Sequence, residues 1–251
     1  MPGVDSLTAY DDWLARQNGG AFGPRRYQRT RRYMCTGRDL AGWVDADPPL
    51  QAAYHTLSIL LQMGAPLDPA SPYVQQITNQ DAFTTFGPVE WFDCIGRAPR
   101  PAHEAVWFQK WRIHRSLRPE EYGGRVHNHL IGAFAYPSGH AVGAGATITM
   151  LKAIFDEHFV IPRPVEPTAD GLRLRPYVGP PLTVGGERNK LAFNIGMARV
   201  MAGIHWRSDV IAGNTLGQEV ALAILQDMRP AYNEPYSGFT LTKFDGTTFQ
   251  V

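Results

Sequence analysis

Three short segments of the sequence hold the residues whose types and spacing could carry out chemistry. In the first, seven residues separate Lys110 from Arg118. The second is the tetrapeptide Pro-Ser-Gly-His at 137–140, and in the third five residues separate Arg199 from His205. Lysine and arginine supply positive charges, serine a hydroxyl, and histidine a nitrogen that can bond a central atom or move a proton. The set is typical of a site that binds an anion and acts on it.

Together these groups predict a cradle for a tetrahedral oxyanion. Three cations offer many hydrogen-bond donors. Gly139 follows Ser138 at the start of a predicted helix, where backbone N–H groups and the helix dipole favour anions. Of the two histidines, one can bond the central atom and the other can transfer protons. Any one segment alone is more often a solvated helix face or a surface turn, but all three in this order favour the functional interpretation.

The hydrophobic periodicity predicts a mainly α-helical single domain over 1–251 that positions these segments. Pro48 and Pro49 open the first strong helix and Gly64 ends it, while Ser138 is the expected N-cap of a later one. The predicted helices span about 50–63, 86–96, 102–115, 138–156, 187–203 and 208–228. The rest is predicted to be an irregular N-terminal arm (1–49), a loop (66–81), a long proline-containing loop (160–184) and a C-terminal β-hairpin (237–251) that turns at Asp245-Gly246.

Composition and charge exclude several classes of partner. The chain has 251 residues and a net charge of +1, so nothing global indicates nucleic acid or an acidic membrane surface. The longest weakly charged stretch, 141–151, is far shorter than the ~20 apolar residues of a membrane span. The N-terminus has no basic start followed by an apolar run, so no signal peptide is expected, and the unknown compartment defaults to the cytoplasm. Cys35 and Cys94 are expected to be free thiols.

The sequence in and around the three segments resembles that of a known superfamily. The segments VWFQKWRIHRSLRPEEYGG (106–124), AYPSGHAV (135–142) and ARVMAGIHWRSD (198–209) are similar to the signature shared by vanadium haloperoxidases and type 2 phosphatidic acid phosphatases. The seven-residue gap before Arg118 resembles the algal and cyanobacterial bromoperoxidases, because the fungal chloroperoxidases have one residue fewer. The words GRDLAGWV, DGLRL, GERNKLAFN and FDGTTF extend the resemblance. It covers roughly 10–251 and corresponds to the C-terminal half of those longer enzymes.

This resemblance implies a fold, a cofactor and a role for each site residue. The fold would be a helical bundle of the vanadium haloperoxidase and acid phosphatase type, with a small C-terminal hairpin. His205 would bond the vanadium of a vanadate cofactor through Nε2, His140 would act as acid and base, and Asp209 would accept the other ring N–H of His205. An N-terminal helix charge is an equally good interpretation of Asp209. Five groups would hydrogen-bond the vanadate oxygens: Lys110, Arg118, Ser138, Gly139 and Arg199.

The implied activity is that of a vanadate-dependent haloperoxidase. Hydrogen peroxide would oxidise a halide, bromide or iodide, to hypohalous acid that halogenates an organic acceptor, and Lys110 would polarise an oxygen of the bound peroxide. Two alternatives stay open: an acid phosphatase with His205 as nucleophile and His140 as acid, and a non-catalytic helical half that binds phosphate or needs a partner chain. Ala133 stands where the algal bromoperoxidases have histidine and the fungal chloroperoxidases phenylalanine, which leaves the halide preference open.

The resemblance also predicts a homo-oligomer, a dimer or larger. In the longer relatives the corresponding helices pack against a further helical half. The helix at 50–63, or the apolar side of 140–155, would then need a covering partner. The Arg- and Tyr-rich stretch 25–33 is either a solvated loop or an arm that reaches a neighbouring subunit.

Overall fold

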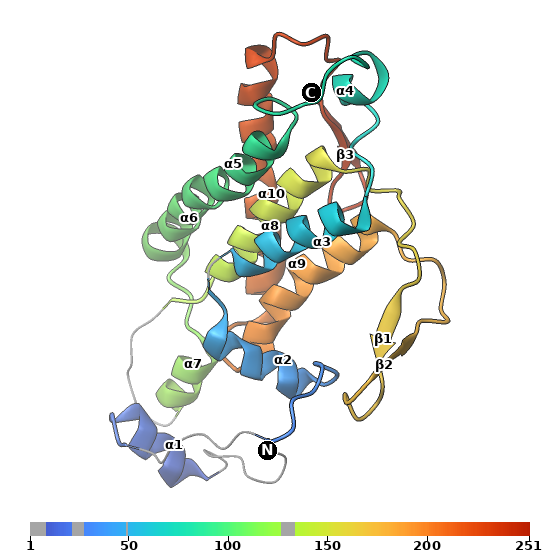
Figure 1. Ribbon diagram of the computed structural model, residues 1–251. Coiled ribbons are helices and arrows are strands. Elements are labelled where there is room, and N and C mark those ends of the chain that lie inside the picture. Colours follow the sequence, from blue (N-terminus) through green and yellow to red (C-terminus); the bar gives the residue numbers. More distant parts are fainter. Residues whose placement is uncertain (1–8, 22–27, 49, 127–133) are drawn as a thin grey trace.

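A computed structural model describes residues 9–21, 28–48, 50–126 and 134–251 of the chain (Figure 1). The α-helices are α1 (Tyr10–Gln17), α2 (Gly37–Trp43), α3 (Gln51–Met63), α4 (Pro72–Gln75), α5 (Pro88–Arg97), α6 (Pro99–Phe108), α7 (Pro119–Val126), α8 (Gly139–Ile154), α9 (Val184–Met201) and α10 (Arg207–Met228). A π-helix (Gln109–His114) continues α6, and short 3-10 turns follow α2 and α10 at Val44–Ala46 and Arg229–Ala231. The strands are β1 (Val165–Pro167), β2 (Leu174–Pro176), β3 (Thr240–Thr242) and β4 (Thr248–Gln250).

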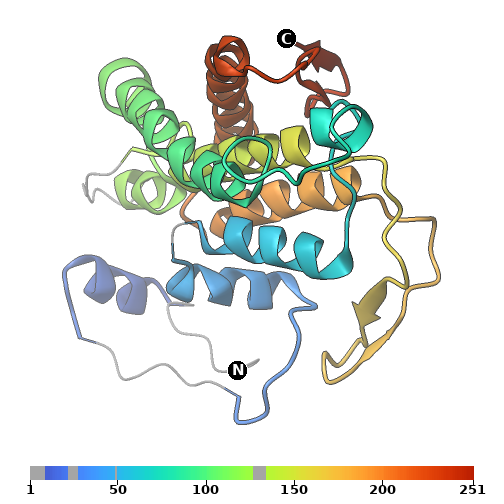
Figure 2. The same cartoon turned by 45° about the horizontal axis from the view of Figure 1, so that its top comes forward.

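Helix α8 is the centre of the fold. Helices α3, α5, α6, α9 and α10 all pack on it, and Figure 2 shows it enclosed between them. Every residue from Gly139 to Ala153 except His140 is buried. The expectation that the apolar side of 140–155 needs a partner chain is therefore wrong, because other helices of the same chain cover it.

Helices α8 and α10 approach each other closely because glycines face the contact. A Cβ atom on Gly217 would lie 2.1 Å from the carbonyl oxygen of Val142, and one on Gly145 would lie 2.3 Å from the carbonyl oxygen of Asn214. Real Cβ atoms do not come this close, so larger residues would push the two backbones apart. This close packing fixes how the first turns of the two helices sit relative to each other.

The predicted helix ends agree with the structure where the local signals are strong. Helix α3 ends at Gly64, whose φ of 66° is left-handed, as expected for a helix-terminating glycine. The C-terminal hairpin is also confirmed: β3 pairs with β4 in antiparallel register, with Leu241 opposite Phe249, and the turn lies around Gly246.

Three parts of the chain contain more regular structure than the sequence predicted. The arm 1–49 holds α1 and α2, the loop 66–81 holds α4, and the long loop 160–184 holds the antiparallel pair of β1 and β2. Helix α2 begins with a reciprocal cap in which the Thr36 hydroxyl accepts from the Asp39 N–H at 3.2 Å while the Asp39 carboxylate accepts from the Thr36 N–H at 3.0 Å. Arg32 pairs with Asp39 at 2.5 Å, so this part of the stretch 25–33 is held by its own chain.

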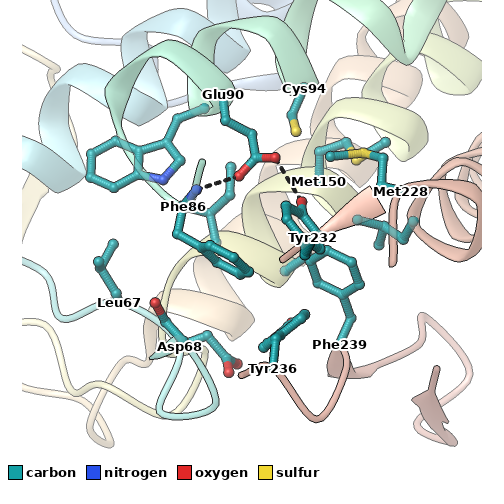
Figure 3. Close-up of a pocket in the computed structure, with 15 residues that line it drawn as sticks. Leu67, Asp68, Phe86, Glu90, Cys94, Met150, Met228, Tyr232, Tyr236 and Phe239 are labelled. Carbon is teal, nitrogen blue, oxygen red and sulfur yellow. Dashed lines mark hydrogen bonds between the residues drawn. The ribbon is translucent and has the colours of Figure 1, made fainter. Parts of the chain in front are cut away.

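A partly buried carboxyl ties the C-terminal segment to α5, at the end of α8 far from its first turn. Glu90 accepts hydrogen bonds from the backbone N–H of Phe86 at 2.6 Å and from the Tyr232 hydroxyl at 2.7 Å (Figure 3). Burial raises the pKa of Glu90. Phe86 has a left-handed φ of 55°, and its ring contacts that of Tyr232 in a tilted arrangement and that of Tyr236 edge to face, with ring centroids 4.4 and 4.8 Å apart. The aromatic cluster and Glu90 together hold residues 232–239 on the helical body.

Two further expectations concern the thiols and the membrane. Cys35 and Cys94 are free thiols in the structure, as predicted. Burial raises the pKa of the Cys94 thiol to about 12, which makes it unreactive at neutral pH. Within the ranges that the structure describes, no helix has the length and hydropathy that a membrane span requires.

Candidate functional site

The first turns of α8 and α10 meet, and this junction is the base of the candidate site. The backbone N–H of Ser138 donates to the carbonyl oxygen of Asp209 at 2.9 Å. Ser138 is the N-cap residue of α8, as predicted, but its hydroxyl makes no capping bond. The side chain is fully buried, and Oγ has no hydrogen-bond partner among the described residues. A buried hydroxyl beside the free N–H groups of a helix start is suited to hold an anion.

His205 lies directly before α10 and is held by Asp209. Its Nδ1 is 3.0 Å from Asp209 Oδ2, and that oxygen also accepts from the backbone N–H of Trp206 at 2.9 Å. A carboxylate only accepts, so Nδ1 carries the hydrogen and Nε2 keeps its lone pair. Both side chains are almost fully buried. Burial lowers the pKa of His205 below its usual value, and the bond to Asp209 acts in the opposite direction.

Lys110 lies in the π-helix rather than in the α-helix that the sequence predicted over 102–115. Helix α6 ends at Phe108, and the wider turn ends at Arg115, whose φ of 50° is left-handed. Lys110 is 3% exposed, and its Nζ lies 4.9 Å from the centroid of the Trp107 ring. Burial and the neighbouring Arg118 lower the pKa of Lys110 to about 8.

Arg118 is placed by the loop that precedes it. The Trp206 indole Nε1 donates to the carbonyl oxygen of Leu117 at 2.9 Å, which ties the loop to the start of α10. The backbone N–H of Ala135 donates to the carbonyl oxygen of Ser116 at 2.8 Å, which ties it to the segment before α8. Arg118 Nε is buried without a hydrogen-bond partner within the described part of the chain.

Arg199 enters the site from α9 and is held by a partner that the sequence did not indicate. Its guanidinium forms an ion pair with Asp47, and both side chains are largely buried. A second nitrogen donates to the carbonyl oxygen of Ile195 at 2.9 Å, and the guanidinium lies 5.8 Å from the centroid of the Trp43 ring. Only Nε is left without a partner among residues that the structure describes. Asp47 and Trp43 thus orient Arg199 and leave its Nε donor free.

His140 lies in the first turn of α8 and is the one exposed residue of that helix before Ile154. Partial burial of the ring lowers the pKa of His140 to about 4, and the positive charge of Arg199 acts in the same direction. His205 is close enough to contribute in the same direction. At neutral pH His140 is therefore unprotonated, reached by solvent and able to accept a proton.

These groups together fit an oxyanion. Ser138 Oγ, Arg118 Nε and Arg199 Nε are buried donors without partners in the described ranges, and no carboxylate there forms an ion pair with Lys110. Buried donors normally have partners, so several unsatisfied ones in one place indicate a ligand that accepts from them. Two of the acidic side chains near these donors, Asp47 and Asp209, are already engaged with Arg199 and His205. Vanadate, a tetrahedral oxyanion with several negative oxygens, matches this donor set.

Gly139 lies in the first turn of α8 beside Ser138, as predicted, and a Cβ there would come 3.4 Å from the Trp107 ring. Ala133 lies outside the described residues. None of the motif residues lines the cavity of about 20 Å³ beside Glu90, so this cavity is separate from the candidate site.

Known proteins resemble this chain in sequence and in fold. Residues 125–234 match the family model of the VCPO second helical-bundle domain. The whole chain is 34% identical over 312 residues to a vanadium-dependent bromoperoxidase of Corallina officinalis and 31% identical over 303 residues to one of Ascophyllum nodosum. Its fold matches the homohexameric second vanadate-dependent bromoperoxidase of Ascophyllum nodosum with a TM-score of 0.87 at 24% identity. These findings confirm the resemblance and the predicted fold class.

The match is complete for this chain and partial for its relatives. The alignments with these three relatives each cover 100% of this chain, but only 52% of the Corallina officinalis protein and 54% of each Ascophyllum nodosum protein. The chain therefore spans about half the length of the curated relatives it matches.

Proposed function

We propose that this chain is a vanadate-dependent haloperoxidase that uses hydrogen peroxide to oxidise bromide or iodide to hypohalous acid. The observation that carries the proposal is the set of unpartnered buried donors beside a histidine whose Nε2 lone pair is free. The similarity of the chain to vanadium-dependent bromoperoxidases supports it. When bound, vanadate would supply a Lewis acid that activates hydrogen peroxide for two-electron oxidation of a halide.

The residues of the chain divide the work between binding and proton transfer. His205 would bond the vanadium through Nε2, because Asp209 holds the hydrogen on Nδ1. The oxygens would be held by the side chains and backbone N–H groups of Lys110, Arg118, Ser138, Gly139 and Arg199. These donors are fixed before any ligand arrives, so they need little reorganisation to hold negative charge.

His140 would take a proton from hydrogen peroxide and return one later. Its pKa of about 4 leaves the ring unprotonated at neutral pH, which suits a general base. An anion bound near its ring would raise that pKa and help it to hold the proton. Lys110, whose pKa is lowered to about 8, would polarise the peroxide oxygen that reacts with the halide.

The same donors could serve a phosphatase, and that is the second candidate. His205 Nε2 would attack phosphorus, and His140 would protonate the leaving oxygen. The unprotonated state of His140 at neutral pH disfavours the acid role in the free protein. The similarity of the whole chain to bromoperoxidases also supports the first proposal.

We also propose that the chain acts as a homo-oligomer. Ile59 and Leu61 on α3 are 60% and 42% exposed, and the bromoperoxidase with the matching fold is homohexameric. Light scattering tests this: the proposal expects a multiple of 27.9 kDa, and a mass near 27.9 kDa would contradict it.

The activity test is vanadate-dependent bromination of a phenolic dye, run beside hydrolysis of p-nitrophenyl phosphate. The proposal expects bromination that requires vanadate, bromide and peroxide together, and that is lost in His205→Ala. The matched control is His158→Ala, because His158 is an exposed loop histidine and its loss should leave activity unchanged. Phosphate hydrolysis without any bromination would support the phosphatase instead.

A further inference from the structure

A pocket beside the candidate site has no role in the chemistry described so far. It has a volume of about 450 Å³, opens to solvent, and has mainly apolar walls. Leu50 lies on one side, and Gly96, Pro99, His103 and Trp107 of α5 and α6 form the other. Pockets of 300–1,000 Å³ with apolar walls and a few polar groups are typical of small-molecule sites.

Trp107 is a wall that the pocket shares with the candidate oxyanion site. On one side its ring lies 4.9 Å from Lys110 Nζ, and a Cβ on Gly139 would touch it at 3.4 Å. The same residue lines the pocket and is 53% exposed. A flat ring bound against this indole would therefore be separated by the indole from the donors that hold the anion.

His103 gives the pocket one oriented polar group. Its Nδ1 lies 2.7 Å from the carbonyl oxygen of Pro99. Because a carbonyl only accepts, Nδ1 carries the hydrogen and Nε2 is left as an acceptor. Nε2 has no partner among the residues described. The ring lies against α8 where Gly143 has no side chain, since a Cβ there would come 3.1 Å from Cε1. The imidazole is thus fixed on two sides.

The charged residues of the pocket do not oppose an uncharged ligand. Arg100 and Glu104 pair with each other at 3.1 Å, and both side chains are largely exposed. Their charges are satisfied and solvated, so the pocket presents apolar walls, an exposed indole and one hydrogen-bond acceptor. This combination favours a neutral planar ring that carries one O–H or N–H donor.

We infer that this pocket binds the organic acceptor of the halogenation, a phenol-like or indole-like ring whose donor bonds to His103 Nε2. The inference rests on the proposed haloperoxidase function and names its acceptor site. Hypohalous acid from the neighbouring site reacts with the bound ring: a C–halogen bond replaces a C–H bond, and the released proton combines with the hydroxide of the acid to give water. His103 is a positioning residue, because it holds the ring and does not touch the reacting halogen.

The first test measures binding without vanadate, halide or peroxide. Fluorine NMR titrations compare 4-fluorophenol with 4-fluoroanisole, which has the same ring without the donor. One hydrogen bond predicts that the phenol binds about fivefold more tightly than the anisole. His103→Phe should remove this preference, and His103→Gln, which keeps an acceptor, should retain part of it. His158→Phe is the matched control and should behave as the wild type.

The second test follows turnover in the reconstituted enzyme. His103→Phe should lower kcat/KM for bromination of 4-fluorophenol by about the same factor as its binding. Bromide-dependent release of dioxygen from hydrogen peroxide, which needs no organic acceptor, should not change. The ratio of brominated isomers from the wild type should differ from that given by free hypobromous acid.

The outcomes separate the pocket from the proposed activity. Equal binding of phenol and anisole, or an unchanged preference in His103→Phe, would overturn the inference even if the enzyme brominates. A product ratio equal to that of free hypobromous acid would overturn it as well. Selective binding of the phenol without vanadate-dependent bromination would instead refute the proposed function and leave the pocket as a ring-binding site.

Discussion

The bond between His205 and Asp209 makes a quantitative prediction about vanadate affinity. In Asp209→Ala, His205 Nδ1 and the Trp206 N–H both lose their acceptor, because the same carboxylate oxygen serves both at 3.0 and 2.9 Å. A hydrogen bond to a charged group contributes about 1.5–3 kcal/mol. If that free energy supports the correct tautomer for vanadate, its loss weakens binding roughly 10- to 100-fold.

Asp209→Asn separates the charge from the geometry. An amide oxygen in the place of the carboxylate oxygen can still accept from both His205 and Trp206, so only the negative charge is lost. We expect this variant to bind vanadate between the wild type and Asp209→Ala, about fivefold weaker than wild type.

The assay is an equilibrium titration of the vanadate-free protein, followed by the loss of the free vanadate signal in vanadium NMR. The matched control is Thr183→Ala, which removes the side-chain cap of α9, a 3.1 Å bond to the Gly186 N–H, away from the site. It should lose about 1 kcal/mol of stability and no affinity. If folded Asp209→Ala binds vanadate within about twofold of the wild type, the proposed role of Asp209 is wrong.

Three further predictions test charge and burial. Lys110→Ala should lower turnover at saturating vanadate more than it lowers vanadate affinity, because the other donors still hold the anion. Steady-state kinetics with vanadate titration measure both, and a weakened affinity with normal saturated turnover would mean that Lys110 only binds vanadate. Sulfate, which does not titrate in this range, should bind more weakly as the pH rises through about 8, since Lys110 loses its charge there, and calorimetry on Lys110→Met should show no such step. The pKa of Glu90 is higher in the folded protein than in the unfolded chain. Glu90 therefore stabilises the fold below its unfolded-state pKa, and this stabilisation is lost as the pH rises through its folded-state pKa. The free energy of unfolding, measured with urea, should therefore differ less between pH 4 and pH 7 in Glu90→Gln than in the wild type. An equal difference in the two proteins would contradict the account.

The sequence was most informative where one short segment carries both the chemistry and the structure. Ser138 directly precedes α8, as its predicted role of N-cap requires, and Asp209 lies four residues after His205, within reach of the contact that the resemblance implied. The helix ends at Gly64 and the turn at Gly246 were predictable for the same reason, because glycine favours the left-handed backbone found there.

What the sequence did not predict depends on contacts between distant segments or on weak local signals. Asp47 pairs with Arg199 across 152 positions, and no local pattern marks it. The π-helix around Lys110 arises from packing and leaves no periodicity of its own. By contrast, the start of α2 could have been recognised, because Thr36 and Asp39 have the spacing of a reciprocal helix cap.

The most direct test of the central claim is the electron density of crystals soaked with vanadate. The account predicts a vanadium atom bonded to His205 Nε2, with its oxygens within hydrogen-bond distance of Ser138 Oγ, Lys110 Nζ and the Nε atoms of Arg118 and Arg199. Vanadium bound at another place, or a site at His205 that stays empty at saturating vanadate in well-ordered crystals, would contradict it.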